Sequence, residues 1–382
     1  MKAHRSILQK ASLASAVIVG FGVAGTTAGA NEAAPPGRAV AYAWTERHEA
    51  VYEGKDKDGK ETKQECPNGL NDNGIREQMA ALFPEPAGKN YKLVDAHLAR
   101  EADIWFPNTE ADKFPFHEVS GTTAYGLNLD GKVKPSDFTS PDGQVKGIDN
   151  QFYRAVGCIP SYREGSSQRL FYTQYLESRP FNRTVMELTD VDSLENDDDV
   201  TVTTYRGLHP LVRDAQGEFQ EDTTQVVDTA WGRDFIWASK AKIVNGVLIT
   251  TKPNDLAWPN ENHTNASIDR MREVRFEMKL AGEKIEGLMG GYFDVENTYH
   301  ALIRRFDSHQ ISYGKLAAGS LYKVLHRLAD GYPDPVTGKN TAISGALRVY
   351  GVRVHLIHPE KEVADAPQAG GPRPTQAAGG GE

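Results

Sequence analysis

Apolar and charged residues alternate without interruption over residues 274–280, which is the two-residue period of a half-buried β-strand. The dipeptide Asn245-Gly246 separates two short apolar runs, and these residues readily adopt the positive φ angles of a tight hairpin turn. Another long strand is predicted over residues 347–358. Its apolar residues shift from odd to even positions along the strand, which indicates a β-bulge at Gly351. The clearest local patterns are therefore those of β-structure.

Shorter apolar segments between turn-rich loops predict additional strands. They cover residues 40–44, 170–176, 184–188, 200–205 and 235–238. Helical spacing is clear over residues 320–330, where four apolar residues share one face, and residues 75–83 are a second short candidate. We expect a mainly β protein built as a two-sheet antiparallel β-sandwich, with a loop-rich N-terminal region and one or two short helices.

Residues 1–30 have the pattern of a cleavable signal peptide. Three basic residues precede the apolar stretch 14–24, and Ala28-Gly29-Ala30 supplies the small residues of a cleavage site. A membrane anchor is the alternative reading, but a spanning helix needs about 20 continuous apolar residues, and this stretch is shorter and contains glycines. We therefore expect an exported protein that is periplasmic or secreted.

Composition divides the rest of the chain into three parts. Residues 31–165 are predicted to be a loop-rich region, 166–360 a β-sandwich-like domain, and 361–382 a disordered tail rich in Pro, Gly and Ala. Cleavage after residue 30 removes three bases and no acid, which lowers the net charge from −9 to −12. A chain with this negative charge is not expected to bind nucleic acid. No segment after residue 30 is apolar enough to span a membrane.

The two cysteines, Cys66 and Cys158, are predicted to form a disulfide, because lone thiols in an oxidising compartment usually pair. The bridge would close a loop of about 90 residues and contribute about 4 kcal/mol to stability. Two buried free thiols are the alternative. Two cysteines are too few for a zinc or iron–sulfur site.

A short tandem repeat lies between the cysteines. Residues 130–137 and 142–149 both read D-G-x-V-K-x-x-D. Calcium takes about six to eight oxygen ligands, which a loop can supply from alternate positions around a sharp glycine turn. The sequence therefore predicts a calcium site with ligands drawn from Asn128, Asp130, Asp137, Asp142, Asp149 and Asn150.

Residues 126–137 resemble the calcium loop of dockerin modules, and Asp149-Asn150 looks like the end of a thrombospondin type 3 repeat. The resemblance implies a calcium loop over residues 126–150 only. Gly126 stands where the first ligand is normally an Asp, and Lys134 stands where another oxygen often comes. These departures predict a weaker site, or one completed by residues from elsewhere in the chain.

A second candidate calcium loop consists of Asp56, Asp58 and Glu65, which follow the spacing D-x-D-G-x5-E directly before Cys66. A charged hairpin turn is the alternative, because Asp-Gly is also a common turn dipeptide.

The sequence contains no recognised motif of a serine hydrolase, a zinc protease or a β-lactamase. Trp258 lies in a polar stretch, where an exposed ring could contact a ligand. We expect an exported, soluble, calcium-stabilised binding or accessory protein that recognises an extracellular polymer or glycan. The alternative is a calcium-dependent polysaccharide hydrolase or lyase that uses a carboxylate pair, which the sequence alone does not identify.

Overall fold

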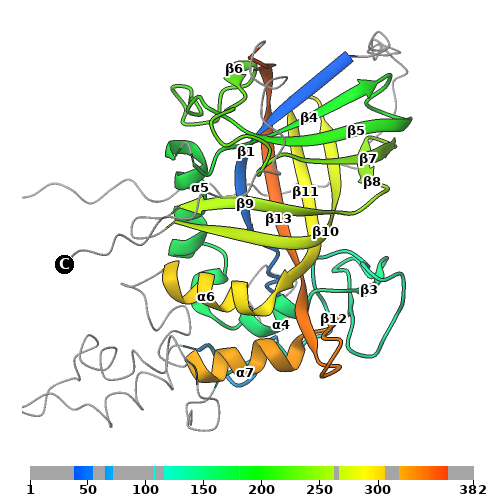
Figure 1. The fold of residues 1–382 in the computed structure, drawn as a ribbon, viewed down its shortest axis with the longest axis vertical. Coiled ribbons are helices and arrows are strands. Elements are labelled where there is room, and N and C mark those ends of the chain that lie inside the picture. Colours follow the sequence, from blue (N-terminus) through cyan, green and yellow to red (C-terminus); the bar gives the residue numbers. More distant parts are fainter. Residues whose placement is uncertain are drawn as a thin grey trace, which may run out of the picture. The chain divides into compact units, whose positions relative to one another are not determined.

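Strand β1 (Arg38–Glu49) hydrogen-bonds to a neighbour along each of its edges. In the computed structural model, which describes residues 38–54, 65–71, 107, 116–179, 181–261, 266–305 and 318–359, β1 pairs with β4 (Thr184–Val191) and with β13 (Asn340–Ile357). The second pairing joins the two ends of one sheet, which therefore closes into a barrel (Figure 1).

Eight strands form the ring, each antiparallel to its neighbours. Their spatial order is β1, β4, β5 (Asp197–Arg206), β7 (Trp237–Val244), β8 (Val247–Thr250), β10 (Ala266–Ala281), β11 (Lys284–Asp294) and β13. The strands outside the ring are β2 (Phe138–Thr139), β3 (Lys146–Ile148), β6 (Thr223–Val226), β9 (Asn254–Glu261) and β12 (Gly331–Pro333). Of these, β2 pairs with β3, β9 with β10, and β6 and β12 with β13.

The predicted two-sheet sandwich is wrong, although the mainly β composition is confirmed. Apolar and polar residues alternate in the same way along a strand of a sandwich and a strand of a barrel, so alternation reports which face is buried and not whether the sheet closes. The closing contact joins Ala41 to Val354, near opposite ends of the chain. No local pattern encodes that pairing.

Side chains fill the barrel interior. Tyr42, Trp44, Trp237 and Phe276 are at most 1% exposed and belong to one apolar cluster to which strands around the ring contribute. An eight-stranded barrel is just wide enough for side chains to fill it. The filled interior leaves the ends of the barrel and its outer face as places where a ligand could bind.

Helices α4 (Gln151–Val156), α6 (Val295–Arg305) and α7 (Ala318–Leu328) gather at one end of the barrel, the lower end in Figure 1. Their apolar residues Phe152, Tyr299 and Leu321 extend the core of the barrel. Helix α7 confirms the helix predicted over residues 320–330.

Residues 170–176, predicted to be a strand, belong instead to helix α5 (Ser167–Ser178), which packs against β1. The aromatic content of this segment favours a strand by propensity. Tyr172, Tyr175 and Leu176 are nevertheless spaced as i, i+3 and i+4 and are all buried. Burial at helical spacing overrides the local preference here.

The long strand predicted over residues 347–358 is confirmed as part of β13, but the predicted bulge at Gly351 is wrong. The register of β13 against β11 runs without a break from Ala342 to Val352. Farther along the strand, Val354 and Leu356 pack against Leu211 on the outside of the barrel. The apolar phase changes because the outer face becomes covered there, and the register shift lies in the partner strand β1.

The Asn245-Gly246 hairpin is confirmed, with φ angles of 52° and 74° between β7 and β8. The predicted signal peptide 1–30, the helix 75–83 and the tail 361–382 lie outside the described residues. Strand β1 is part of the barrel although it precedes the domain boundary predicted at residue 165.

Candidate ligand-binding site

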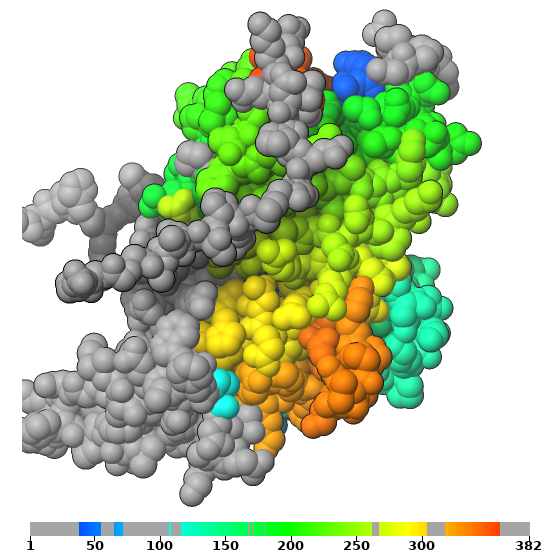
Figure 2. Space-filling model, viewed as in Figure 1, coloured from blue at the N-terminus to red at the C-terminus, as the bar shows by residue number. Residues whose placement is uncertain are grey.

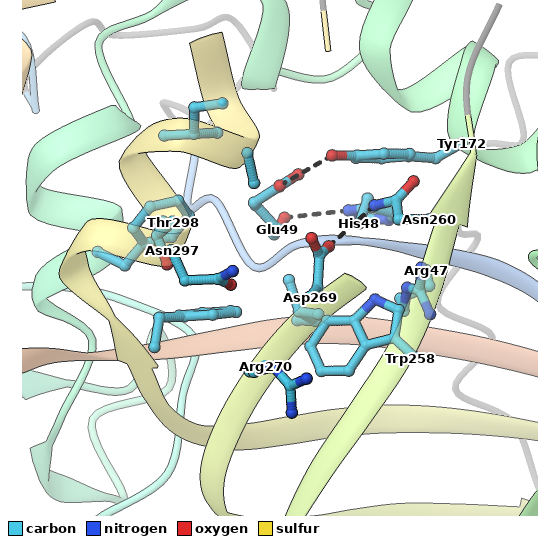
Figure 3. Close-up of a pocket in the computed structure, with 15 residues that line it drawn as sticks. Arg47, His48, Glu49, Tyr172, Trp258, Asn260, Asp269, Arg270, Asn297 and Thr298 are labelled. Carbon is cyan, nitrogen blue, oxygen red and sulfur yellow. Dashed lines mark hydrogen bonds between the residues drawn. The ribbon is translucent and has the colours of Figure 1, made fainter. Parts of the chain in front are cut away.

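A small cavity lined by both polar and apolar side chains lies between the end of β1, the β9–β10 pair and helix α6 (Figure 3). Its polar lining consists of Arg47, His48, Glu49, Tyr172, Asn260, Asp269, Arg270, Asn297 and Thr298. Its volume of about 40 Å³ leaves room for about three water molecules. This inner cavity suits water or one small polar group and is too small for a sugar ring.

The register shift in β1 explains why charged residues face inward here. Trp44 points into the apolar core, and one extra residue, Thr45, separates it from the next paired residue. Such a bulge reverses the inward phase of a strand. Glu49 consequently lies opposite the core residue Leu347, and Arg47 also lines the cavity.

Two polar contacts organise the β9–β10 side of the inner cavity. The Arg47 guanidinium carbon lies 5.0 Å from the centre of the Trp258 ring, which is a cation–π distance. Asn260 Nδ2 donates a 2.9 Å hydrogen bond to Asp269 Oδ2. These contacts hold one cation and one carboxylate in a largely buried place.

His48 is buried and uncharged at neutral pH. Its Nδ1 lies 3.0 Å from the backbone oxygen of Glu49, and because a carbonyl only accepts, Nδ1 carries the proton. Burial, and to a smaller extent the nearby positive charges of Arg169 and Arg348, lower the pKa of His48 to about 4. The Nε2 atom, 4.0 Å from Glu46 Oε2, is left as an acceptor.

A larger outer pocket of about 250 Å³ lies beside the inner cavity and shares His48 and Glu49 with it. Besides His48 and Glu49, its lining includes three tyrosines and four further charged residues: Tyr52, Tyr125, Tyr162, Glu53, Glu164, Arg169 and Arg348. Tyrosine rings combine an apolar face with a polar tip, so this lining suits a polar ligand that also offers a flat or apolar face.

A row of ring contacts builds one wall of the outer pocket. The Arg348 guanidinium lies 5.0 Å from the Tyr125 ring and 5.4 Å from the Tyr350 ring. Tyr125 contacts Tyr52 edge to face at 5.8 Å, and Tyr350 stacks on His48 at 6.0 Å. These contacts fix the orientation of the Arg348 guanidinium before any ligand binds.

The predicted calcium ligands Asp130 and Asp149 are close together. Asp149 Oδ2 accepts hydrogen bonds from the backbone N–H groups of Leu129 (2.7 Å) and Asp130 (3.3 Å). Asp130 forms an ion pair with Lys134 and accepts the backbone N–H of Lys132. Figure 2 shows this part of the chain in teal, on the side of the barrel.

The other predicted ligands hold local turns. Asp137 accepts the backbone N–H of Lys134 (2.6 Å), and Asp142 accepts that of Gln144 (3.0 Å). Asn128 accepts the N–H of Gly131, and Asn150 caps helix α4. In the described residues, no three acidic, histidine or cysteine side chains form a group that could hold a metal ion.

As placed, the 126–150 segment does not fit a completed calcium cage. Its carboxylates accept backbone N–H groups, and the Lys134 ammonium lies where a cation would approach Asp130. Calcium binding by this segment stays a prediction, and it would require Lys134 to leave Asp130.

Asp149 gives the segment a pH-dependent stability. This residue is 1% exposed, and burial raises its pKa to about 6. The Asp149 carboxyl group then binds its proton more tightly in the folded protein than in the unfolded chain. Protonation of Asp149 therefore stabilises the fold: the full gain is present below the pKa of an unfolded Asp and is lost as the pH rises through about 6. Relative to Asp149→Asn, we expect wild type to gain about 2 kcal/mol between about pH 7 and about pH 4. Urea unfolding at both pH values measures this, and parallel profiles would contradict it.

The same variant serves as the control for calcium. If Asp149 ligates calcium, the ion raises the thermal midpoint of wild type but not that of Asp149→Asn. Equal wild-type midpoints in millimolar calcium and in chelator would contradict the calcium prediction.

The remaining sequence-based site predictions have mixed outcomes. The Cys66–Cys158 disulfide is confirmed. Asp56 and Asp58 lie outside the described residues, and Glu65 is buried. The expected exposure of Trp258 is wrong, because it belongs to β9 and is 5% exposed, although its ring lines the inner cavity.

Sequence reasoning missed the residues of the outer pocket. The alternation around Arg348 and Tyr350 could have placed both on the outer face of the strand, opposite the inward Leu347 and Val349. Nothing in the sequence indicates that Tyr125 lies against that face.

Comparison with protein-family models, curated proteins and solved structures finds no match to this chain. Within the described residues, no helix is both long and apolar enough to cross a membrane.

Proposed function

We propose that this chain is an exported, non-enzymatic binding or accessory protein that recognises a residue of an extracellular polymer through the outer pocket. One observation carries the proposal: Tyr52, Tyr125 and Tyr162 line a 250 Å³ pocket together with charged side chains of both signs. Tyrosine rings offer faces for stacking, and the charged groups pair with hydroxyl or charged groups of a ligand. The pocket volume suits one sugar-sized unit and not a long stretch of polymer.

Tyr125→Ala is expected to weaken polymer binding by about fivefold, because one ring contact is worth about 1 kcal/mol. Affinity electrophoresis in gels containing neutral or acidic polysaccharides measures retardation of the folded protein. Tyr322→Ala is the matched control, since Tyr322 is a tyrosine of helix α7 that does not line the outer pocket.

Two results would contradict the proposed function. The first is that no polysaccharide retards the wild-type protein. The second is the release of reducing ends from a polysaccharide, which would favour the hydrolase alternative.

A further inference from the structure

Arg348 lines the outer pocket, and its guanidinium group carries five N–H donors. The rings of Tyr125 and Tyr350 lie near the guanidinium group. Ring stacking uses the faces of a guanidinium and leaves the N–H groups at its edges able to donate. In the described part of the chain, Arg348 contacts these two rings and no carboxylate.

A second arginine also lines the outer pocket. Arg169 of helix α5 lines it and forms a 3.4 Å ion pair with Glu46. Both Arg169 and Arg348 act electrostatically on His48, which is itself neutral. Among the described residues, only Arg169 of these two cations forms an ion pair with a carboxylate.

The other three charged residues of the pocket, Glu49, Glu53 and Glu164, are acidic. Glu53 accepts a hydrogen bond from the backbone N–H of Glu164, and both side chains line the pocket. Carboxylates accept hydrogen bonds from hydroxyl groups. The pocket thus contains both cations, which can pair with an anion, and carboxylates, which can accept from hydroxyl groups.

We propose that the outer pocket binds an acidic sugar residue, with the ligand's carboxylate on the edge of the Arg348 guanidinium and its ring against Tyr125. This inference rests on the proposed function and specifies its ligand class. A uronic acid matches the pocket because it combines one carboxylate, several hydroxyl groups and a ring with a C–H face. An acidic peptide offers the carboxylate without the hydroxyl groups that Glu53 and Glu164 could accept from.

Because the chain carries a net negative charge, binding of an anionic sugar would point to specific contacts in the pocket. At −9 overall, the protein repels anions at long range. Affinity for a uronate must therefore come from local contacts and should depend on Arg348.

The test is isothermal titration calorimetry of the full-length protein with an oligogalacturonate trimer and with its methyl ester. The methyl ester keeps the ring and removes the charge. We expect the acid to bind and the ester to bind at least about tenfold more weakly, because charge-assisted forked hydrogen bonds are the strong ones. Arg348→Gln should remove this discrimination, whereas Arg348→Lys, which keeps the charge without the fork, should retain part of it.

The matched control is Arg233→Gln, since Arg233 is exposed and outside the outer pocket. Equal binding of acid and ester would overturn the inference and leave the proposed function standing. Binding of neither sugar, or of a triglutamate peptide in preference, would also overturn it. Preserved discrimination in Arg348→Gln would show that another residue holds the carboxylate.

Discussion

Removal of the Cys66–Cys158 disulfide is expected to lower the free energy of unfolding by about 4 kcal/mol. The bridge joins residues 92 positions apart, and a cross-link over so long a loop strongly restricts the unfolded chain. It also holds a small apolar cluster in which both cysteines pack with Val119, Phe138 and Tyr153. Loss of the bridge should therefore loosen the segment that carries Tyr125.

Urea unfolding of a Cys66→Ala/Cys158→Ala double variant measures this loss. Wild type in reductant should match the double variant, and reductant should leave the double variant unchanged. Equal unfolding midpoints for wild type with and without reductant, with the bridge shown to be broken, would contradict the expected loss. The m-value should be compared as well, because a cross-link also changes the unfolded state.

Local features of the fold could be predicted because their causes are local. The Asn245-Gly246 hairpin depends on backbone angles that these two residues adopt easily, and helix α7 depends on one apolar face. Barrel closure could not be predicted, because it depends on β1 meeting both β4 and β13. The strand order around a sheet is a global property.

The candidate site was unpredictable for a related reason. The bulge at Thr45 turns Arg47 and Glu49 inward, yet nothing in the residues around it announces the extra position. The outer pocket combines Tyr125, Arg169 and Arg348, which come from three separate parts of the chain. The regular spacing of the Asp-Gly repeat predicts a calcium loop, but Asp137 and Asp142 instead accept backbone N–H groups within local turns.

The inner cavity and the outer pocket differ in whether their charged side chains already have partners within the protein. In the inner cavity, Asp269 already accepts from Asn260, and Arg47 lies over Trp258, so its polar groups serve mainly to stabilise each other. In the outer pocket, the Arg348 guanidinium lies against the rings of Tyr125 and Tyr350 and forms no ion pair with a carboxylate of the described residues. A guanidinium group that is held in place and has no ion-pair partner is preorganised to bind an anionic ligand. For this reason we propose the outer pocket, and not the inner cavity, as the ligand site.

Phe276→Ala is expected to destabilise the protein by about 3 to 5 kcal/mol, the usual cost of deleting a buried aromatic ring. Phe276 is 1% exposed, and its ring lies 6.0 Å from that of Trp44 and 5.0 Å from that of Trp237, both edge to face. Trp44 belongs to β1 and Trp237 to β7, and neither strand is next to β10 in the ring, so these contacts cross the barrel interior. Lys279→Ala, on the exposed face of the same strand, is the control and should cost less than about 0.5 kcal/mol.

A double-mutant cycle between Phe276→Leu and Trp44→Phe separates this cross-barrel contact from general loss of core volume. Residues in contact show coupling of about 0.5 to 1.5 kcal/mol, whereas distant residues show none. Coupling is expected because closure of the sheet brings β1 and β10 to face each other across the core. If the losses of unfolding free energy in the two single variants simply add in the double variant, the two rings do not interact, and the expected contact across the barrel is wrong.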